Sequence, residues 1–262
     1  MLHPVPRQRV FEARYEQGYR YLDRCGDALL ILEDILSQDT HCVWLPEEAT
    51  PTGARLMCPD LDTYVVFNAS SLIIDHQVIG EAQFDFVAVA TTTLSTLVGR
   101  FDLQKMRRFG FRRFFIIPAA DDSIDDADRL SLRLPPVKEW LSSVDPEFVM
   151  RSYEQVSVFE TKDRSKGLRV STKPYTKVGT ELHVDERLKI PPHHLREGQH
   201  KALVEQLRRT QARDRAPEAG VLVDIDYYWM WPPKDTNVKD FIESGMRASE
   251  EALAALVRGK SP

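Results

Sequence analysis

The stretch from residue 220 to residue 233 reads GVLVDIDYYWMWPP, and its alternation constrains the fold more than any other part of the chain. Successive side chains of a β-strand point to opposite faces of the sheet. One face of this strand is apolar and consists of Val221, Val223, Ile225, Tyr227 and Trp229. The other face carries Asp224, Asp226 and Tyr228. The chain therefore contains a sheet with one core face and one wetter face, and both aspartates lie on the wetter one.

Asp224 and Asp226 allow two interpretations. As ligands, two carboxylates on one face could bind Mg²⁺, which prefers oxygen donors, and the protein would be a metal-dependent hydrolase. As structural residues, they would be bound by arginine or lysine, because an unpaired carboxylate in a dry site costs several kcal/mol. We favour the structural interpretation, since alternation explains the pair without any chemistry. It predicts that both aspartates lie on the less buried face of a sheet, with cations from neighbouring strands or helices.

A second strand pattern, KMRRFGFRRFF at residues 105–115, combines five cations with four phenylalanines. Such a strand could neutralise phosphates and stack on bases, and it partly matches the strand signature of the RNA-recognition motif. Under this alternative the nucleic-acid-binding residues are Lys105, Arg107, Arg108, Phe109, Phe111, Arg112 and Arg113. Under the structural alternative the core receives Phe109, Phe111 and Phe115, while the arginines lie outside and pair with acidic residues. Whether the arginines face solvent together or pair with carboxylates distinguishes the two alternatives.

Hydrophobic periodicity predicts the other elements. Strands are predicted where residues alternate or where apolar runs are bounded by turn residues, at 10–15, 54–58, 63–68, 72–78, 106–117, 148–161 and 221–231, with a meander at 168–190. Helices are predicted where apolar residues recur at intervals of three and four, at 19–37, 81–98, 194–213 and 237–258, with a short helix near 137–141. Between residues 37 and 54 we expect a loop rich in proline and threonine.

This order of elements predicts an α+β fold, in which a mostly antiparallel sheet packs against helices. Each half of the chain opens with a long strand, and one arrangement that fits this pattern is two ferredoxin-like halves. The N-terminal half would be residues 1–120. The C-terminal half would be residues 148–262, ending in an amphipathic helix, and the acidic and proline-containing residues 121–147 would form the linker.

Composition excludes several classes of protein. The 262-residue chain has a net charge of −5, so nucleic-acid binding would need a local basic patch. The first residues lack the apolar segment of a signal peptide and no apolar run is long enough for a membrane span, so we expect a cytoplasmic protein that does not associate with membranes. Cys25, Cys42 and Cys58 form no Cys-x-x-Cys pair, which agrees with a reducing compartment. The G-x-S-x-G, G-x-G-x-x-G and H-E-x-x-H motifs are missing, and no cofactor is expected.

Three segments carry a resemblance to a known family: ARLMCPDLDTYVVFNASSLIID, RRFGFRRFFIIP, and VLVDIDYYW ahead of an amphipathic helix. Together they resemble an uncharacterised prokaryotic family of about this length, which shares a glycine-containing basic-aromatic strand and a late Asp-x-Asp strand. Its members are sporadically distributed, which implies antiphage-defence or mobile-element loci, and no activity is established for them. The resemblance therefore implies a non-enzymatic binding, sensor or partner protein whose protein partner is encoded nearby. It leaves the oligomeric state open.

Overall fold

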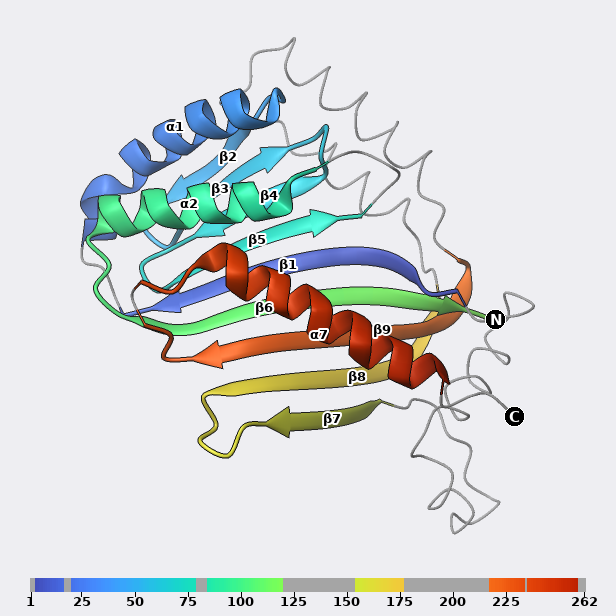
Figure 1. The fold of residues 1–262 in the computed structure, drawn as a ribbon. Coiled ribbons are helices and arrows are strands. Elements are labelled where there is room, and N and C mark those ends of the chain that lie inside the picture. The colour runs from blue at the N-terminus through green and yellow to red at the C-terminus, as the bar shows by residue number, and fades with distance from the viewer. Residues whose placement is uncertain are drawn as a thin grey trace, which may run out of the picture.

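A computed structural model of the chain describes residues 3–16, 20–78, 84–119, 154–176, 217–233 and 235–258. These residues form a nine-stranded sheet with the order β2-β3-β4-β5-β1-β6-β9-β8-β7, in which all neighbouring strands are antiparallel. The strands are β1 (Val5–Tyr15), β2 (Leu45–Thr50), β3 (Gly53–Cys58), β4 (Thr63–Phe67), β5 (Ser71–Gln77), β6 (Met106–Pro118), β7 (Gln155–Glu160), β8 (Lys166–Thr176) and β9 (Ala219–Met230). The helices, α1 (Arg20–Thr40), α2 (Phe86–Phe101) and α7 (Val238–Arg258), all lie on one face of the sheet (Figure 1).

The predicted α+β class with a mostly antiparallel sheet is confirmed. Each predicted strand in the described part of the chain is present as β1, β3, β4, β5, β6, β7, β8 or β9, although β1 starts earlier than predicted. Residues 148–153 of the strand predicted at 148–161 lie outside the described residues. The helices predicted at 19–37, 81–98 and 237–258 occur as α1, α2 and α7. No helix formed by the described residues combines the length and apolarity that crossing a membrane requires.

The loop predicted between residues 37 and 54 is wrong in one part, because β2 lies within it. β2 pairs with β3 from Leu45↔Met57 to Thr50↔Gly53. The strand was not predicted because it contains proline and glutamates, and proline is disfavoured in a sheet except at an edge. β2 is an edge strand, so the proline is tolerated there. Trp44 anchors its start: the indole is 1% exposed, and its Nε1 donates to Oγ1 of Thr40 at 3.0 Å.

The sheet is continuous through both predicted halves of the chain. Within residues 1–120, the order β4-β5-β1-β6 with α1 and α2 on one face is the ferredoxin-like arrangement, which β2 and β3 extend. β6 then pairs with β9 from Arg108↔Met230 to Pro118↔Gly220. The predicted linker at 121–147, its helix at 137–141, the end of the meander at 177–190 and the helix at 194–213 lie outside the described residues.

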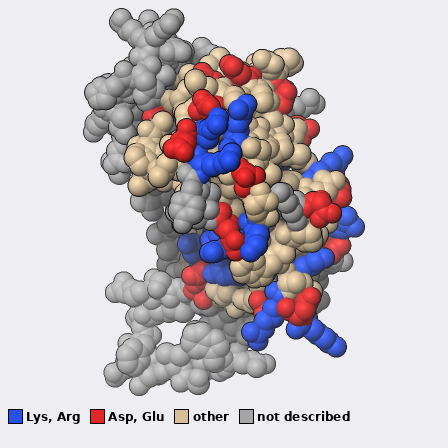
Figure 2. Space-filling model, turned by 90° about the vertical axis from the view of Figure 1, so that its left-hand side faces the viewer, with Lys and Arg blue, Asp and Glu red and all other residues tan. Residues whose placement is uncertain are grey.

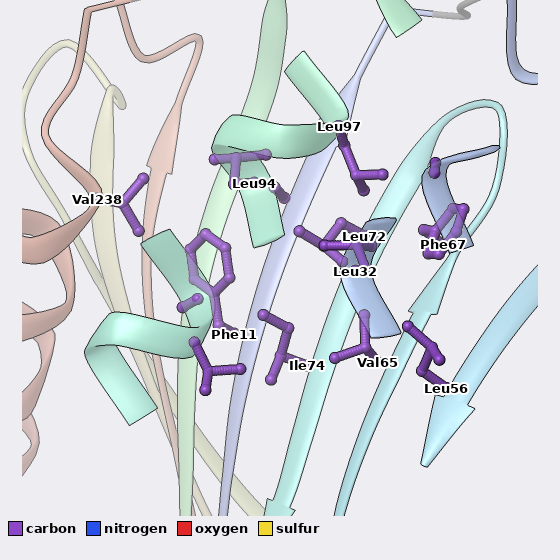
Figure 3. Close-up of a cluster of buried hydrophobic side chains, with 14 of the residues drawn as sticks. Phe11, Leu32, Leu56, Val65, Phe67, Leu72, Ile74, Leu94, Leu97 and Val238 are labelled. Atoms are coloured by element: carbon purple, nitrogen blue, oxygen red, sulfur yellow. The ribbon is translucent and has the colours of Figure 1, made fainter. Parts of the chain in front are cut away.

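The main core lies between the helices and the sheet face that they cover (Figure 3). Intervals of three and four residues place one buried stripe along α1, formed by Tyr21, Cys25, Ala28, Leu29, Leu32 and Leu36. The strands contribute alternate residues that are fully buried, namely Phe11, Leu56, Val65, Phe67, Leu72 and Ile74. Because these side chains interdigitate between two layers, the helices of the first half are held on one face of the sheet.

Helix α7 joins the C-terminal strands to this core. The ring of Phe241 is fully buried and lies against the rings of Phe11, Phe109, Tyr227 and Trp229, with centroid distances of 6.2, 5.5, 5.5 and 5.4 Å. Gly245, one turn later, allows the helix to approach the sheet closely, because a Cβ there would lie 2.8 Å from the ring of Phe111. The same helix therefore packs on strands from both halves of the chain.

His76 of β5 is a buried titratable group within the core. It is 5% exposed, and its Nδ1 lies 3.0 Å from both Oγ1 of Thr63 and the carbonyl oxygen of Leu61. Its ring packs on Phe84 at a centroid distance of 4.4 Å. Burial and the nearby charge of Arg9 lower the pKa of His76 from 6.5 to about 4, against the opposing effect of the Leu61 carbonyl.

This pKa predicts that acidification destabilises the fold. Between pH 6.5 and about 4 the unfolded chain binds a proton at His76 that the folded chain does not bind, so stability rises with pH in this window and is lost as pH falls. One pKa unit corresponds to about 1.4 kcal/mol, so the full shift is worth about 3 kcal/mol. Urea unfolding of the wild type and of His76→Asn across this window measures the effect. We expect His76→Asn to lose the part of the pH dependence of the free energy of unfolding that His76 contributes. His41→Asn, at an exposed histidine, should keep it. Equal slopes in wild type and His76→Asn would contradict the assignment.

Candidate functional site

Charged side chains of opposite sign alternate across the sheet face that points away from the helices. Arg108 of β6 lies between Asp226 of β9 and Glu12 of β1. Its Nη2 donates to both carboxylate oxygens of Asp226, at 2.9 and 2.7 Å, and its Nη1 donates to Glu12. The exposed fractions of the three side chains are between 15% and 19%. This is a largely desolvated, charge-assisted pairing rather than a loose surface ion pair.

Asp224 continues the pattern toward the edge of the sheet. Nε of Arg112 donates to Oδ1 of Asp224 at 2.6 Å, and its Nη2 donates to Oδ2. Arg169 of β8 lies 3.8 Å from the same carboxylate and 3.9 Å from Glu154. We call the following set the charge ladder: Glu12, Arg108, Asp226, Arg112, Asp224, Arg169 and Glu154. The prediction that arginine or lysine side chains hold both aspartates on the sheet face opposite the core is confirmed, although Asp224 is itself buried, at 6% exposed.

Two glycines make room for the charge ladder and for the tyrosine beside it. Arg108 folds over Gly110, where a Cβ would collide with the guanidinium group. Tyr228 folds over Gly167 of β8 in the same way, and its hydroxyl donates to Glu160 at 2.8 Å. The guanidinium carbon of Arg108 lies 5.4 Å from the centroid of the Tyr228 ring. The glycine of the basic-aromatic strand is thus explained by packing, because a larger residue would push the guanidinium group of Arg108 out of this position.

Burial and charge act against each other at Asp226. Burial raises the pKa of Asp226 above its ordinary value of 3.8, and the charges of Arg108 and Arg112 oppose this rise. The hydrogen bond to Asp224 is the main reason why the pKa of Arg112 is raised. The ionised form of Asp226 therefore depends on arginines that do not release their protons in proteins.

The geometry gives no support to Asp224 and Asp226 as metal ligands. All four of their carboxylate oxygens accept hydrogen bonds from guanidinium groups. A Mg²⁺ ion would have to displace these donors and share its site with two cations. Within the six described segments, no group of three or more His, Cys, Asp and Glu side chains could hold a metal ion.

The basic-aromatic strand is β6, and it is divided only in part as the structural alternative predicts, because Arg108 and Arg112 lie opposite the core but Arg113 shares the helix side with the phenylalanines. Phe109 and Phe111 are 2% and 0% exposed, so neither ring is available to stack on a base, which corrects their place in the nucleic-acid hypothesis. On the helix side, Nη1 of Arg113 donates to Glu250 at 3.1 Å. Arg108 and Arg112 belong to the charge ladder, as described above.

The cations at the start of β6 do not form a basic surface of their own. Lys105 lies 3.6 Å from Glu16, and Arg107 is exposed. Figure 2 shows the end of the molecule where β6 begins, and there the basic and acidic side chains are interspersed. Such a mixture supplies little of the one-sign field on which phosphate binding depends.

A different candidate lies at one edge of the sheet. β7 pairs with β8 from Gln155↔Thr172 to Glu160↔Gly167, and no described residue pairs with its outer side. Its apolar side chains are open to solvent: Val156, Val158 and Phe159 are 45%, 55% and 60% exposed. An edge strand that no described residue pairs with, and that carries exposed apolar side chains, is a template for another strand.

A groove of about 420 Å³ adjoins β7 on the helix side of the sheet. α7 crosses the sheet obliquely over β6, β9 and β8, and β7 lies beyond it (Figure 1). The sheet side of the groove is formed by Gln155, Ser157, Phe159, Leu168, Val170 and Thr172, and the helix side by Ala248, Glu251, Ala252, Ala255 and Leu256. We call β7 and this groove together the β7 surface.

The opposite edge of the sheet is protected against further pairing, which makes the open edge at β7 more informative. β2 contains Pro46, which has no backbone N–H, and its pairing with β3 is interrupted by a bulge between Pro46 and Glu48. Glu47 adds charge and lies 2.8 Å from Arg55. Proline, a bulge and charges are the usual devices that prevent edge-to-edge association. From Gln155 to Phe159, β7 contains neither proline nor charge.

Sequence reasoning predicted a strand at 148–161 but did not identify the β7 surface. Which strand lies at an edge depends on the order of strands in the sheet, and local alternation does not encode this order. One available signal was the run QVSVF, which has no charged residue on either face. A strand with one solvent-exposed face more often carries charged residues on that face.

Comparisons with known proteins add little to this geometry. No protein-family model matches the chain. Over 80 residues it is 34% identical to histidinol-phosphate aminotransferase 2 of Burkholderia mallei (strain ATCC 23344), and this match covers 30% of the chain and 21% of the aminotransferase. The chain thus spans about a fifth of the length of that relative. A match this short assigns neither a family nor an activity.

Proposed function

We propose that the protein acts by binding another protein, and that the β7 surface is where it binds. The single observation that carries the proposal is an unprotected edge strand with exposed Val156, Val158 and Phe159 beside an apolar groove. An extended segment that adds to such an edge gains main-chain hydrogen bonds, and its alternate side chains gain contacts in the adjoining pocket. The edge at β2, blocked by proline and a bulge, does not offer this mode of binding.

The charge ladder supports a binding role rather than a catalytic one. Its carboxylates and guanidinium groups are engaged with one another, so they are not poised to act as acid, base or metal ligand toward a substrate. The ladder instead ties β1, β6, β9 and β8 together at the centre of the sheet. A rigid sheet is a suitable frame for an edge strand that must present a fixed row of hydrogen-bonding groups.

The resemblance described above suggests the setting in which this binding takes place. A sporadically distributed bacterial family fits a cytoplasmic sensor or partner protein of an antiphage-defence or mobile-element locus. Its protein partner would then be a neighbouring gene product.

Affinity capture from the native host, followed by reconstitution with purified components, tests the proposal. We expect a captured protein to bind the wild type and to lose affinity by ~10-fold or more for Val156→Lys/Val158→Lys, because two charges on an exposed strand oppose pairing. Ala49→Lys at the exposed end of β2 is the matched control and should bind normally. The proposal fails if every reconstituted partner, including the chain itself, binds the β7 variant as tightly as the wild type.

A further inference from the structure

We infer that the strand added to β7 is β7 of a second copy of this chain, which makes a dimer with one continuous antiparallel sheet. The inference rests on the proposed function and names the partner that the edge fits best. A twofold axis perpendicular to the sheet would pair β7 with itself in the antiparallel sense. Both copies would then keep their helices on the same face of the joined sheet.

Geometry restricts the register of such a pair. Residues directly opposite each other in antiparallel strands point to the same face, so even-numbered residues of β7 must oppose even-numbered ones, and odd must oppose odd. Val156, Val158 and Glu160 point away from the helices, while Ser157 and Phe159 line the groove on the helix side. The two registers with the most contacts place either Ser157 or Val158 on the twofold axis.

Side-chain size favours the register with Val158 on the axis. In that register Phe159 of each copy lies opposite Ser157 of the other copy, on the helix side of the sheet. Ser157 is small and lines the groove, so each Phe159 ring can cover the groove of its partner. With Ser157 on the axis, two serines would face each other and leave the space beside them unfilled.

Charge favours the same register. With Ser157 on the axis, Glu154 of each copy would lie opposite Glu160 of the other. With Val158 on the axis, Glu160 lies opposite the uncharged Val156 instead. Like charges destabilise a cross-strand pair, so self-pairing centred on Val158 avoids this repulsion.

Sedimentation of the purified full chain over a wide range of concentrations tests the dimer. We expect a concentration-dependent dimer in the wild type, weakened ~10-fold or more in Val158→Lys, where two lysines would face each other on the axis. Ala49→Lys is again the matched control. Val158 is 55% exposed, so its variant is expected to fold, and circular dichroism checks this.

Cross-linking tests the register directly. A short bifunctional thiol reagent should join two copies of Val158→Cys across the axis, because opposed Cβ atoms lie about 5 Å apart, whereas Val156→Cys opposes Glu160 and should be joined far less. The wild type provides the background, since Cys25 and Cys58 are buried and Cys42 is partly exposed. A monomer at all concentrations, or a dimer unaffected by Val158→Lys, overturns this inference. If a different protein then binds through β7, the proposed function stands and only the identity of the partner is wrong. If β7 variants alter no association at all, both are wrong.

Discussion

Replacing Arg108 with methionine is expected to lower the free energy of unfolding by about 2–4 kcal/mol at neutral pH. The change removes the shared partner of Asp226 and Glu12 and leaves two largely buried carboxylates next to each other. Breaking a buried ion pair by removing one partner typically costs about 3–5 kcal/mol, and the partial exposure of these side chains reduces the effect. Arg14→Met is the matched control, because Arg14 contacts the same glutamate but is 58% exposed, and exposed pairs are worth at most about 1 kcal/mol.

The loss in Arg108→Met should depend on pH in a defined direction. Burial raises the pKa of Asp226 in the folded state, and Arg108 is the largest effect opposing this rise. Without Arg108 the pKa of Asp226 in the folded state rises further. Between the pKa of Asp226 in the unfolded chain and its higher pKa in the folded variant, the folded variant therefore binds a proton that the unfolded chain has released. The free energy of unfolding of the variant falls as the pH increases between these two values. Urea unfolding should therefore show that the variant and the wild type differ little in their free energy of unfolding near pH 4, and that this difference grows toward about pH 7. A gap that is constant with pH would show that Arg108 contributes packing rather than charge.

Phe241→Ala is expected to destabilise the protein by about 3–5 kcal/mol, the range for deleting a fully buried phenylalanine. The cost includes the cavity left among four aromatic rings, two of which, Phe11 and Phe109, belong to the N-terminal half. Because α7 crosses strands from both halves, we expect one cooperative transition at lower denaturant, rather than loss of the C-terminal strands alone. Tryptophan fluorescence reports on all four tryptophans, which include Trp44 in the N-terminal half and Trp229 in the C-terminal half, and far-ultraviolet circular dichroism reports on the whole sheet.

The same substitution at Phe159 is the control for Phe241→Ala. Phe159 is 60% exposed, so Phe159→Ala should change the free energy of unfolding by no more than about 0.5 kcal/mol at dilute concentration. Two separate transitions in Phe241→Ala would contradict the view that α7 joins the two halves into one cooperative unit. A decrease of less than about 1 kcal/mol in the free energy of unfolding of Phe241→Ala would contradict the view that the Phe241 ring contributes a buried core contact.

The faces of the strands could be predicted from sequence, because alternation has a period of two and admits only one assignment for a strand such as β9. That Asp224 and Asp226 would share a face with cations follows from the cost of burying a lone carboxylate. Which cations hold them could not be predicted. Arg108 is 118 positions from Asp226 and 96 positions from Glu12, and only the order and register of the strands bring them together.

The two edge strands, β2 and β7, both show that edge position could not be predicted from the sequence. β2 was predicted as a loop because its proline and glutamates are poor strand formers, yet those residues suit an edge that must not pair further. β7 was predicted as a strand, but nothing local indicated that it is an edge. Edge position is a property of the whole sheet, so sequence patterns that report on single strands detect the strand and not its neighbours.

The central position of β6 has a consequence for how the chain leaves the ribosome. β6 can pair with β1 as soon as it is synthesised, but its other side waits for β9, more than a hundred residues later. During this interval β6 is itself an exposed edge with an aromatic side, the kind of segment that invites aggregation. Arg108 already meets Glu12 of β1 at this stage, but Arg112, not yet neutralised by Asp224, gives that transient edge the positive charge of a gatekeeper. One of the residues that clamp the finished sheet is therefore expected to keep the nascent chain soluble until β9 is synthesised.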